Sequence, residues 1–278
     1  MYSFVRHSGL TINDCFLDFL KDVGLADFRI LKNYEEGDLF KKNRFRSVMR
    51  IEVKDRIFYL KKHFWPLREK LISVIPWIKR EDAVNEWENL ILLDRLGIKT
   101  MVPVAFGEQR RFGLPFFSLT LTENIYDAEK MERYLPAHFS PPLSADSLKL
   151  KRTLIRRLAD FAKDFHDKGL NHQDFYLGHL YLRPGDGSIF IIDVQRLHQR
   201  KCIRRHDLIK DLAQLAYSCQ SLCIFTRTDC MRFIHVYLGK DRLDRHEKRL
   251  VRTITGKAER IASHDAKLQA RKQGRVNL

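Results

Sequence analysis

The sequence has few cysteines and no long apolar run. Its five cysteines are an odd number and none of them forms a C-x-x-C pair, so we expect neither a disulfide framework nor a zinc ribbon. We expect Cys219 and Cys223, one helical turn apart, to be buried thiols on an apolar helix face. No run reaches the roughly 18 apolar residues that mark a membrane-spanning helix. Because residues 1–6 also lack the apolar core of a signal peptide, the sequence predicts a cytoplasmic protein.

The sequence also lacks a glycine-rich phosphate-binding loop and is short of acidic residues. Such a loop would precede the strands that the residue pattern predicts at 46–61. There, Gly37 is followed by the basic run KKNR at 41–44, whose side chains would have to hold the phosphates of a nucleotide instead. Lysine and arginine number 51 against 35 acidic residues, and residues 196–278 alone carry a net charge of +12, from 20 basic and 8 acidic residues. Such a surface attracts polyanions, among them ATP, nucleic acid and anionic lipid. We expect no nucleic-acid partner, because the aromatic residues lack the spacing of a base-stacking platform.

One segment in the second half of the chain has the order of parts of a phosphoryl-transfer site. A helical pattern of apolar residues ends at Gly169, and a loop follows that carries Asp174 and, five residues later, His179. A polar turn then leads into an apolar strand that ends in Asp193. In protein kinases this order places one carboxylate at the attacking hydroxyl and another at the Mg²⁺ that binds the nucleotide phosphates. The same order here predicts a kinase-like catalytic segment.

The residues in and after this loop resemble one kinase family. The stretches that carry the resemblance are HQDFYLGHLYL at 172–182, IIDVQR at 191–196 and RRHDLIKDLA at 204–213. They are similar to the lipopolysaccharide core heptose and Kdo kinases, and most of all to the heptose(I) kinase branch, with a looser resemblance over 40–237. The chain departs from protein kinases at Gln173, where arginine is usual, at His179, where asparagine is usual, and in having D-V-Q in place of D-F-G.

The resemblance implies an α+β, bilobal protein-kinase-like fold. A small, β-rich N-lobe would occupy residues 1–124 and a larger, mostly helical C-lobe residues 125–278. Residue patterns predict the following elements: a strand hairpin at 46–61, a helix at 81–96, strands at 101–107 and 116–122 with a polar turn at 108–113, a loop-rich connector at 125–150, and an amphipathic helix or frayed tail from 241.

In the N-lobe, the resemblance assigns the phosphate contact to Lys61, on the second strand of the hairpin. Glu86, in the helix that follows, would pair with Lys61 and orient it toward the phosphates of ATP. Glu88, on another face of the same helix, is the alternative partner. Solvated charges at a strand edge and on a helix surface remain the plain alternative for both members of the pair.

In the C-lobe, the resemblance makes Asp174 the catalytic base, or the residue that orients the acceptor hydroxyl. Asp193 would be the main Mg²⁺ ligand, with His179 beside it, although an imidazole is a softer ligand than Mg²⁺ prefers. Asp207 would support the catalytic loop, or else be a charge at a helix N-terminus.

The implied function is an ATP-dependent kinase that phosphorylates a sugar of the lipopolysaccharide inner core, heptose I. The alternatives are a Kdo kinase or protein kinase of the same fold, and a catalytically inactive scaffold, which the missing glycine-rich loop favours. With the core glycolipid as acceptor, the protein is expected at the cytoplasmic face of the inner membrane, in peripheral contact with anionic lipid. Residues 63–80, with two tryptophans and flanking basic residues, would lie in the bilayer interface or pack on the N-lobe.

Overall fold

The structure, a computed structural model, describes residues 2–64, 83–111 and 114–276. It divides into two compact units. The sheet unit comprises Met1–Tyr126 and the short segment Asp193–Arg196, and the helical unit comprises Asp127–Ile192 and Leu197–Leu278. The protein is thus α+β, as predicted, with an N-terminal antiparallel sheet and a helical C-terminal region.

The sheet unit is built on an antiparallel sheet that has seven strands in the described residues. Its strands are β1 (Phe4–His7), β2 (Leu10–Asn13), β3 (Asp38–Lys42), β4 (Arg46–Val53), β5 (Arg56–Phe64), β6 (Pro103–Arg111) and β7 (Leu114–Glu123). They lie in the order β1-β2-β6-β7-β5-β4-β3. The helical segments are η1 (Asp14–Phe16), α1 (Leu17–Asp22), α2 (Phe28–Asn33), α4 (Ala83–Arg95) and η3 (Val194–Arg196).

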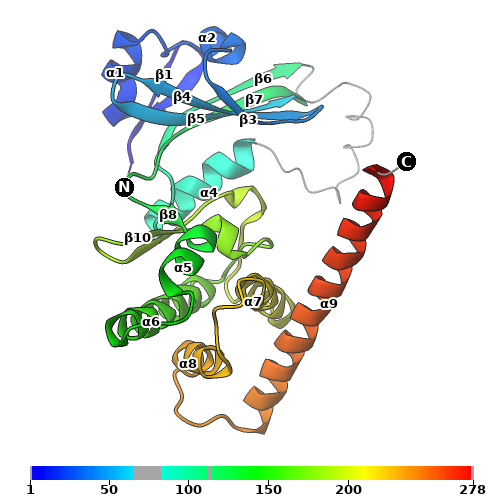
Figure 1. Cartoon of the computed structure of the whole chain (residues 1–278). Helices are drawn as coiled ribbons and strands as arrows, with labels where there is room; N and C mark the ends of the chain where they lie inside the picture. Colours follow the sequence, from blue (N-terminus) through cyan, green and yellow to red (C-terminus); the bar gives the residue numbers. More distant parts are fainter. Residues whose placement is uncertain (1, 65–82, 112–113, 277–278) are drawn as a thin grey trace. The chain divides into compact units, whose positions relative to one another are not determined.

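Alternation along β5 gives the sheet one apolar face and one polar face. Phe58 and Leu60 are fully buried and join the side chains of α1 and α2 in the core of the unit. Lys61 and His63 point to the opposite side, because successive strand residues alternate. Figure 1 shows α1 and α2 on one side of the sheet and α4 on the other. Since Lys61 contacts Glu86 of α4, the polar face is the one toward α4.

The predicted hairpin at 46–61 is confirmed, with β4 and β5 paired from Arg46–His63 to Val53–Arg56. The predicted polar turn at 108–113 is wrong for residues 108–111, which belong to β6. Consecutive polar residues favour a turn, but here the register with β7 continues to the Arg111–Leu114 pair. Ladder hydrogen bonds and a solvent-exposed strand end accommodate polar residues.

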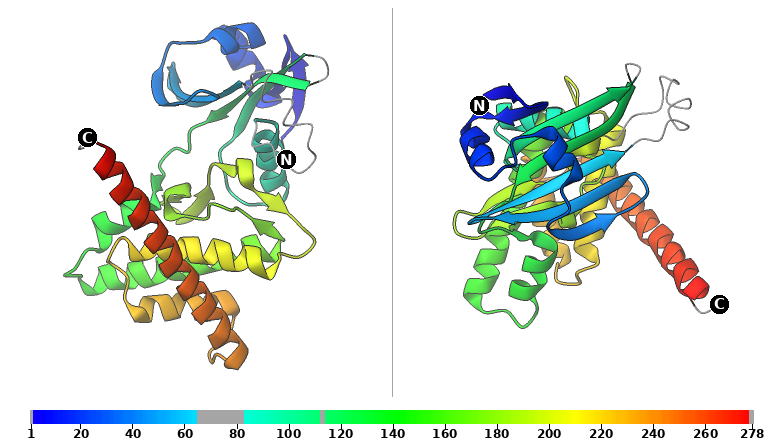
Figure 2. Two further views of the ribbon diagram at one scale, coloured as in Figure 1. Left: turned by 90° about the vertical axis from the view of Figure 1, so that its right-hand side faces the viewer. Right: turned by 90° about the horizontal axis from the view of Figure 1, so that it is seen from above.

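The helical unit contains five helices and several short strands in its described residues. The helices are α5 (Met131–Phe139), α6 (Ala145–Asp167), α7 (Arg205–Gln220), α8 (Arg227–Leu238) and α9 (Arg245–Val276), with one 3₁₀ turn, η2 (Leu177–His179). The strands are β8 (Glu129–Lys130), β9 (Leu170–Asn171), β10 (Leu180–Arg183), β11 (Ser188–Ile191) and β12 (His198–Gln199). Helix α6 packs on α8, and α7 on the long α9, which both views in Figure 2 show as one uninterrupted helix.

The loop-rich connector predicted at 125–150 is wrong, because α5 and the start of α6 occupy most of it. Pro136 lies inside α5, where proline removes one backbone donor. The helix forms nonetheless because it buries an apolar face that includes Met131, Leu135 and Phe139. Tertiary packing of such a face supplies most of a short helix's stability.

The prediction of two buried thiols on one helix face is also wrong. Helix α7 ends at Gln220, and Cys223 lies beyond it in a turn with φ of +55° and is exposed. Cys219 remains within α7, where burial raises the pKa of its thiol.

Across the residues that the structure describes, no helix is both long enough and apolar enough to span a bilayer. The predicted membrane-contact segment at 63–80 is placed only at its first two residues, which belong to β5. Its remainder lies outside the described residues.

Candidate active site

Lys61 lies on an interior strand of the sheet unit and is buried. Strand β5 runs between β4 and β7, so the alternative of a solvated edge lysine is wrong. The Lys61 ammonium forms an ion pair and hydrogen bond with Oε1 of Glu86, whose side chain is fully buried on α4. Glu88, the alternative partner, is exposed on the same helix. The structure therefore pairs the predicted lysine with the first of the two predicted glutamates.

Lys62 points away from this pair, as the alternation predicts. Its ammonium donates to the backbone oxygens of Lys32 (2.8 Å) and Tyr34 (2.6 Å). Burial lowers the pKa of Lys62. This lysine anchors the segment that contains α2, and only Lys61 is directed at Glu86.

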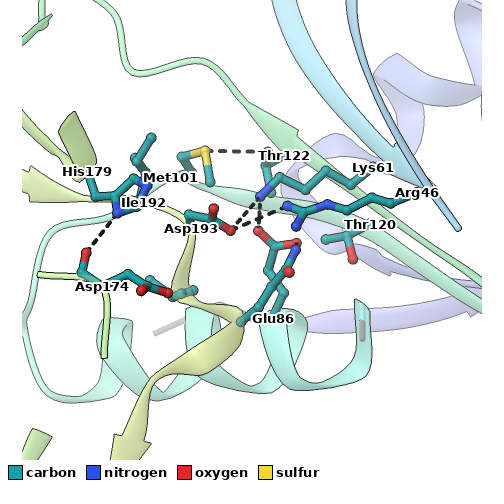
Figure 3. A network of polar contacts seen from close by, with 12 residues as sticks. Arg46, Lys61, Glu86, Met101, Thr120, Thr122, Asp174, His179, Ile192 and Asp193 are labelled. Carbon is teal, nitrogen blue, oxygen red and sulfur yellow. Dashed lines mark hydrogen bonds and ion pairs between the residues drawn. The ribbon is translucent and has the colours of Figure 1, made fainter. Parts of the chain in front are cut away.

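Asp193 joins the Lys61–Glu86 pair in the sheet unit. Its Oδ1 lies 3.7 Å from the Lys61 ammonium and 3.4 Å from an Arg46 guanidinium nitrogen. Figure 3 shows the Lys61 ammonium between the two carboxylates, with Arg46 reaching Asp193 from β4. The backbone φ of Asp193 is +57°, a conformation that few non-glycine residues adopt. The surrounding contacts therefore hold this side chain in a specific position.

The residues after Asp193 tie this turn to α4. The side-chain amide of Asn89 donates to the Val194 carbonyl (2.7 Å), and the Gln195 amide donates to Oε2 of Glu86 (3.1 Å). Glu86 thus receives hydrogen bonds from Lys61 on one oxygen and from Gln195 on the other. The D-V-Q sequence has a structural reason here, because its glutamine fixes the glutamate that pairs with the lysine. The departure from D-F-G is visible in the sequence, but this contact is not.

Replacing Glu86 with glutamine should lower kcat/KM for ATP by about 10- to 100-fold. The variant keeps the side-chain shape but removes the charge that holds the buried Lys61 ammonium, and a hydrogen bond to a charged group contributes about 1.5–3 kcal/mol. Glu88→Gln is the matched control and should change kcat/KM by no more than about twofold, since exposed helix charges matter little. Steady-state kinetics at varied ATP measures both. Equal effects of the two variants would contradict the assignment of Glu86.

A histidine lies on the same face of the sheet as Lys61. His63 is 3% exposed, and burial, with the nearby cations of Arg46 and Lys61, lowers its pKa to about 3, against a smaller opposing effect of Asp193. The ring is therefore neutral near pH 7. It contributes a polar group to this face without adding charge.

The H-x-D loop of the helical unit is held by a buried carboxylate of α7. Asp211 is fully buried, and its two oxygens accept hydrogen bonds from the backbone nitrogens of His172 (2.8 Å) and Gln173 (3.2 Å). The φ of Gln173 is +65°, so the carboxylate supports a strained turn immediately before Asp174.

The prediction that Asp207 supports this loop is therefore wrong by one helical turn. The Asp207 carboxylate lies 3.9 Å from Arg200 and 3.5 Å from His206. It occupies the first turn of α7, where a negative charge is favourable. The loop-supporting carboxylate belongs to Asp211 instead.

Two more side chains on the same face of α7 continue this support along the loop. Gln214 accepts from the Phe175 nitrogen (3.0 Å) and donates to the Gln173 carbonyl (2.7 Å), so it binds the backbone on both sides of Asp174. Ser218 accepts from the Leu177 nitrogen (3.1 Å). With Asp211, these residues have a spacing of three and four, which places them on one helix face. In the sequence, the signal for these three residues is that polar side chains recur at helical spacing between apolar ones.

The side chain of His179 is hydrogen-bonded to the backbone of Asp174. Its Nδ1 donates to the Asp174 carbonyl at 2.7 Å, shown in Figure 3, so the Nε2 of a neutral ring carries the lone pair. The His179 carbonyl accepts from the Ile192 nitrogen (3.0 Å), and His172 Nε2 donates to the Ile192 carbonyl (3.0 Å). Asp174, His179 and the residue that precedes Asp193 are thus connected within the helical unit.

The carboxylate of Asp193 is the best-suited metal ligand among the predicted residues. Its side chain is 37% exposed, and carboxylate oxygen is the ligand type that Mg²⁺ prefers. No group of three or more histidine, cysteine, aspartate or glutamate side chains that could bind a metal occurs in the described ranges. Mg²⁺ at kinase sites takes one or two carboxylates together with substrate phosphates and water, so this donor set fits it.

Protein-kinase-like phosphotransferases typically have a buried lysine–glutamate pair next to an aspartate that follows a strand hairpin. They also have a supported H-x-D loop, as this chain does. Comparison with known sequences agrees and is more specific. The chain belongs to the lipopolysaccharide kinase (Kdo/WaaP) family, whose sequence profile matches residues 32–237. The family predicted from the three sequence stretches is thereby confirmed.

Individual relatives carry names from this family. The chain is 29% identical over 236 residues to the lipopolysaccharide core heptose(I) kinase WaaP of Escherichia coli, covering 81% of this chain and 88% of the relative. It is 27% identical over 242 residues to the enzyme of the same name from Pseudomonas aeruginosa, covering 81% and 87%. A solved structure described as WaaP in complex with acyl carrier protein matches with a TM-score of 0.70 and 26% identity, over 90% of this chain and 98% of that one.

Proposed function

We propose that this protein transfers the γ-phosphoryl group of ATP to a hydroxyl of heptose I in the lipopolysaccharide inner core. The observation that carries the proposal is the cluster of Lys61, Glu86 and Asp193, which contains the groups that a kinase uses to bind nucleotide phosphates. Membership of the family supports a lipopolysaccharide sugar as acceptor. The names of the relatives favour heptose I over other sugars of the core.

Each predicted residue has a role in this reaction. Lys61 binds the phosphates of ATP, and Glu86, itself held by Gln195, orients Lys61. Asp174 accepts the proton of the sugar hydroxyl while the hydroxyl oxygen bonds to the γ-phosphorus and the bond from that phosphorus to the ADP oxygen breaks. Positioning and charge stabilisation supply most of the catalysis in such transfers.

Asp193 would hold Mg²⁺, which when bound neutralises charge on the phosphates. His179 would be at most a weak ligand of that metal, because imidazole suits softer metals than Mg²⁺. Its hydrogen bond from Nδ1 to the Asp174 carbonyl favours a second role, which is to fix the turn that carries the base.

Transfer of radiolabelled γ-phosphate to two purified acceptors tests the proposal. One acceptor is an unphosphorylated lipopolysaccharide core that contains heptose, and the other ends at Kdo. We expect label on the heptose-containing acceptor alone, its loss on chelation of Mg²⁺, and recovery when Mg²⁺ is restored. Label on the Kdo-only acceptor would reassign the enzyme to Kdo, the sugar that the family name contains. Label on neither, with measurable ATP binding, would overturn the proposal.

A further inference from the structure

Arg46 and His63 face each other across the β4–β5 hairpin, on the same side as Lys61. The register of the hairpin pairs Arg46 with His63 directly, and directly opposite residues of antiparallel strands point to the same face. His63 and Lys61 are two residues apart on β5, so they also share a face. A basic residue, a neutral imidazole and the predicted phosphate-binding lysine therefore lie side by side on the polar face.

Two buried nitrogens on this face make no hydrogen bond inside the described part of the chain. They are Nε of Arg46 and Nε2 of His63. Buried polar groups are nearly always paired in folded proteins, and an unpaired one is costly. The Arg46 side chain as a whole is 22% exposed, so it is partly accessible to solvent. Its Nη2 also reaches Asp193. This face is built to receive a hydrogen-bond acceptor.

Arg46 and Lys61 approach the same carboxylate oxygen. Oδ1 of Asp193 lies 3.4 Å from Nη2 of Arg46 and 3.7 Å from Nζ of Lys61. A phosphate group that binds Lys61 beside this carboxylate would therefore lie within reach of the guanidinium. Arginine presents a rigid fork of donors that matches phosphate oxygens, which a lysine cannot do.

We propose that Arg46 binds the terminal phosphates of the nucleoside triphosphate, in the role that a glycine-rich loop has in protein kinases. The inference rests on the proposed function and adds a binding residue to it. The basic run at 41–44, which the sequence suggests for this role, fits less well, because Lys41, Lys42 and Arg44 are all exposed. Arg46, like Lys61, contacts Asp193.

Equilibrium binding of ATP, ADP and AMP to three forms of the full-length protein tests the inference. The forms are wild type, Arg46→Gln and the matched control Arg44→Gln, which removes an exposed charge from the turn that precedes β4. Arg46→Gln should weaken ATP binding by about 10- to 100-fold, as expected for a lost charge-assisted contact, and leave AMP binding unchanged. Arg44→Gln should leave all three affinities within about twofold of wild type. Arg46→Lys, which keeps the charge but not the fork, should recover only part of the ATP affinity.

Three results of these titrations would overturn the role of Arg46. The first is an unchanged ATP affinity in Arg46→Gln. The second is an equal loss in Arg44→Gln, which would indicate a general effect of positive charge near β4. The third is a parallel loss of AMP binding, which would indicate damage to the fold instead of a lost phosphate contact. If wild type binds no nucleotide, the proposed kinase function itself fails, a result that does not depend on either variant.

Discussion

Replacing Asp174 with asparagine should lower kcat for phosphoryl transfer by about 10²–10⁴-fold, the contribution typical of a positioned general base. Asparagine has the same shape but cannot accept the proton of the sugar hydroxyl. The hydrogen bonds that shape the turn here, from His179 Nδ1 and the Tyr176 nitrogen, both end on the Asp174 carbonyl of the backbone. Because the substitution leaves that carbonyl in place, the fold and the Kd for ATP should stay close to wild type.

Single-turnover kinetics with saturating ATP, alongside a nucleotide titration, measures the two quantities separately. Asp160→Asn is the matched control, because Asp160 is an exposed aspartate of α6 in the same unit. It should change neither kcat nor Kd. An Asp174→Asn enzyme that turns over at the wild-type rate would show that another group meets the acceptor hydroxyl.

Replacing Asp211 with alanine should produce the largest loss of stability. The buried carboxylate accepts hydrogen bonds from two backbone nitrogens, and each buried donor left without a partner costs about 1–3 kcal/mol. We therefore expect the free energy of unfolding of the helical unit to fall by about 2–6 kcal/mol. Turnover should fall as well, because the turn before Asp174 loses its support. Asp211→Asn, which keeps one acceptor oxygen, should have an intermediate effect.

Urea denaturation measures this loss of stability as a shift of the transition midpoint at constant slope. The control is Asp207→Ala, one turn earlier on α7, whose carboxylate is partly exposed and lies 3.9 Å from Arg200 and 3.5 Å from His206. That change should cost no more than about 1 kcal/mol. If both alanine variants lose the same stability, the loop does not depend on Asp211.

The catalytic segment was predictable because its signals are local. The helix that ends before Gly169, the β10–β11 hairpin and the strand end before Asp193 follow from apolar periodicity and turn residues close together in the chain. The orientation of Lys61 and Lys62 to opposite faces followed from strand alternation alone.

Other features depend on contacts between distant residues, which periodicity does not encode. Asp207 and Asp211 are one turn apart on the same helix, and only the packing of α7 on the loop decides which carboxylate reaches it. The role of Arg46 could not be predicted from the sequence for the same reason, since its partner Asp193 is 147 positions away. Helix α5 was missed because burial of its apolar face outweighs the presence of Pro136.

The most direct test of the central claim is to map the phosphate on the product. Unphosphorylated lipopolysaccharide is incubated with the enzyme, ATP and Mg²⁺, and the released core oligosaccharide is analysed by mass spectrometry and phosphorus NMR. We expect one added phosphoryl group, located on heptose I. A core that gains no phosphoryl group, from an enzyme that demonstrably binds ATP, would contradict it.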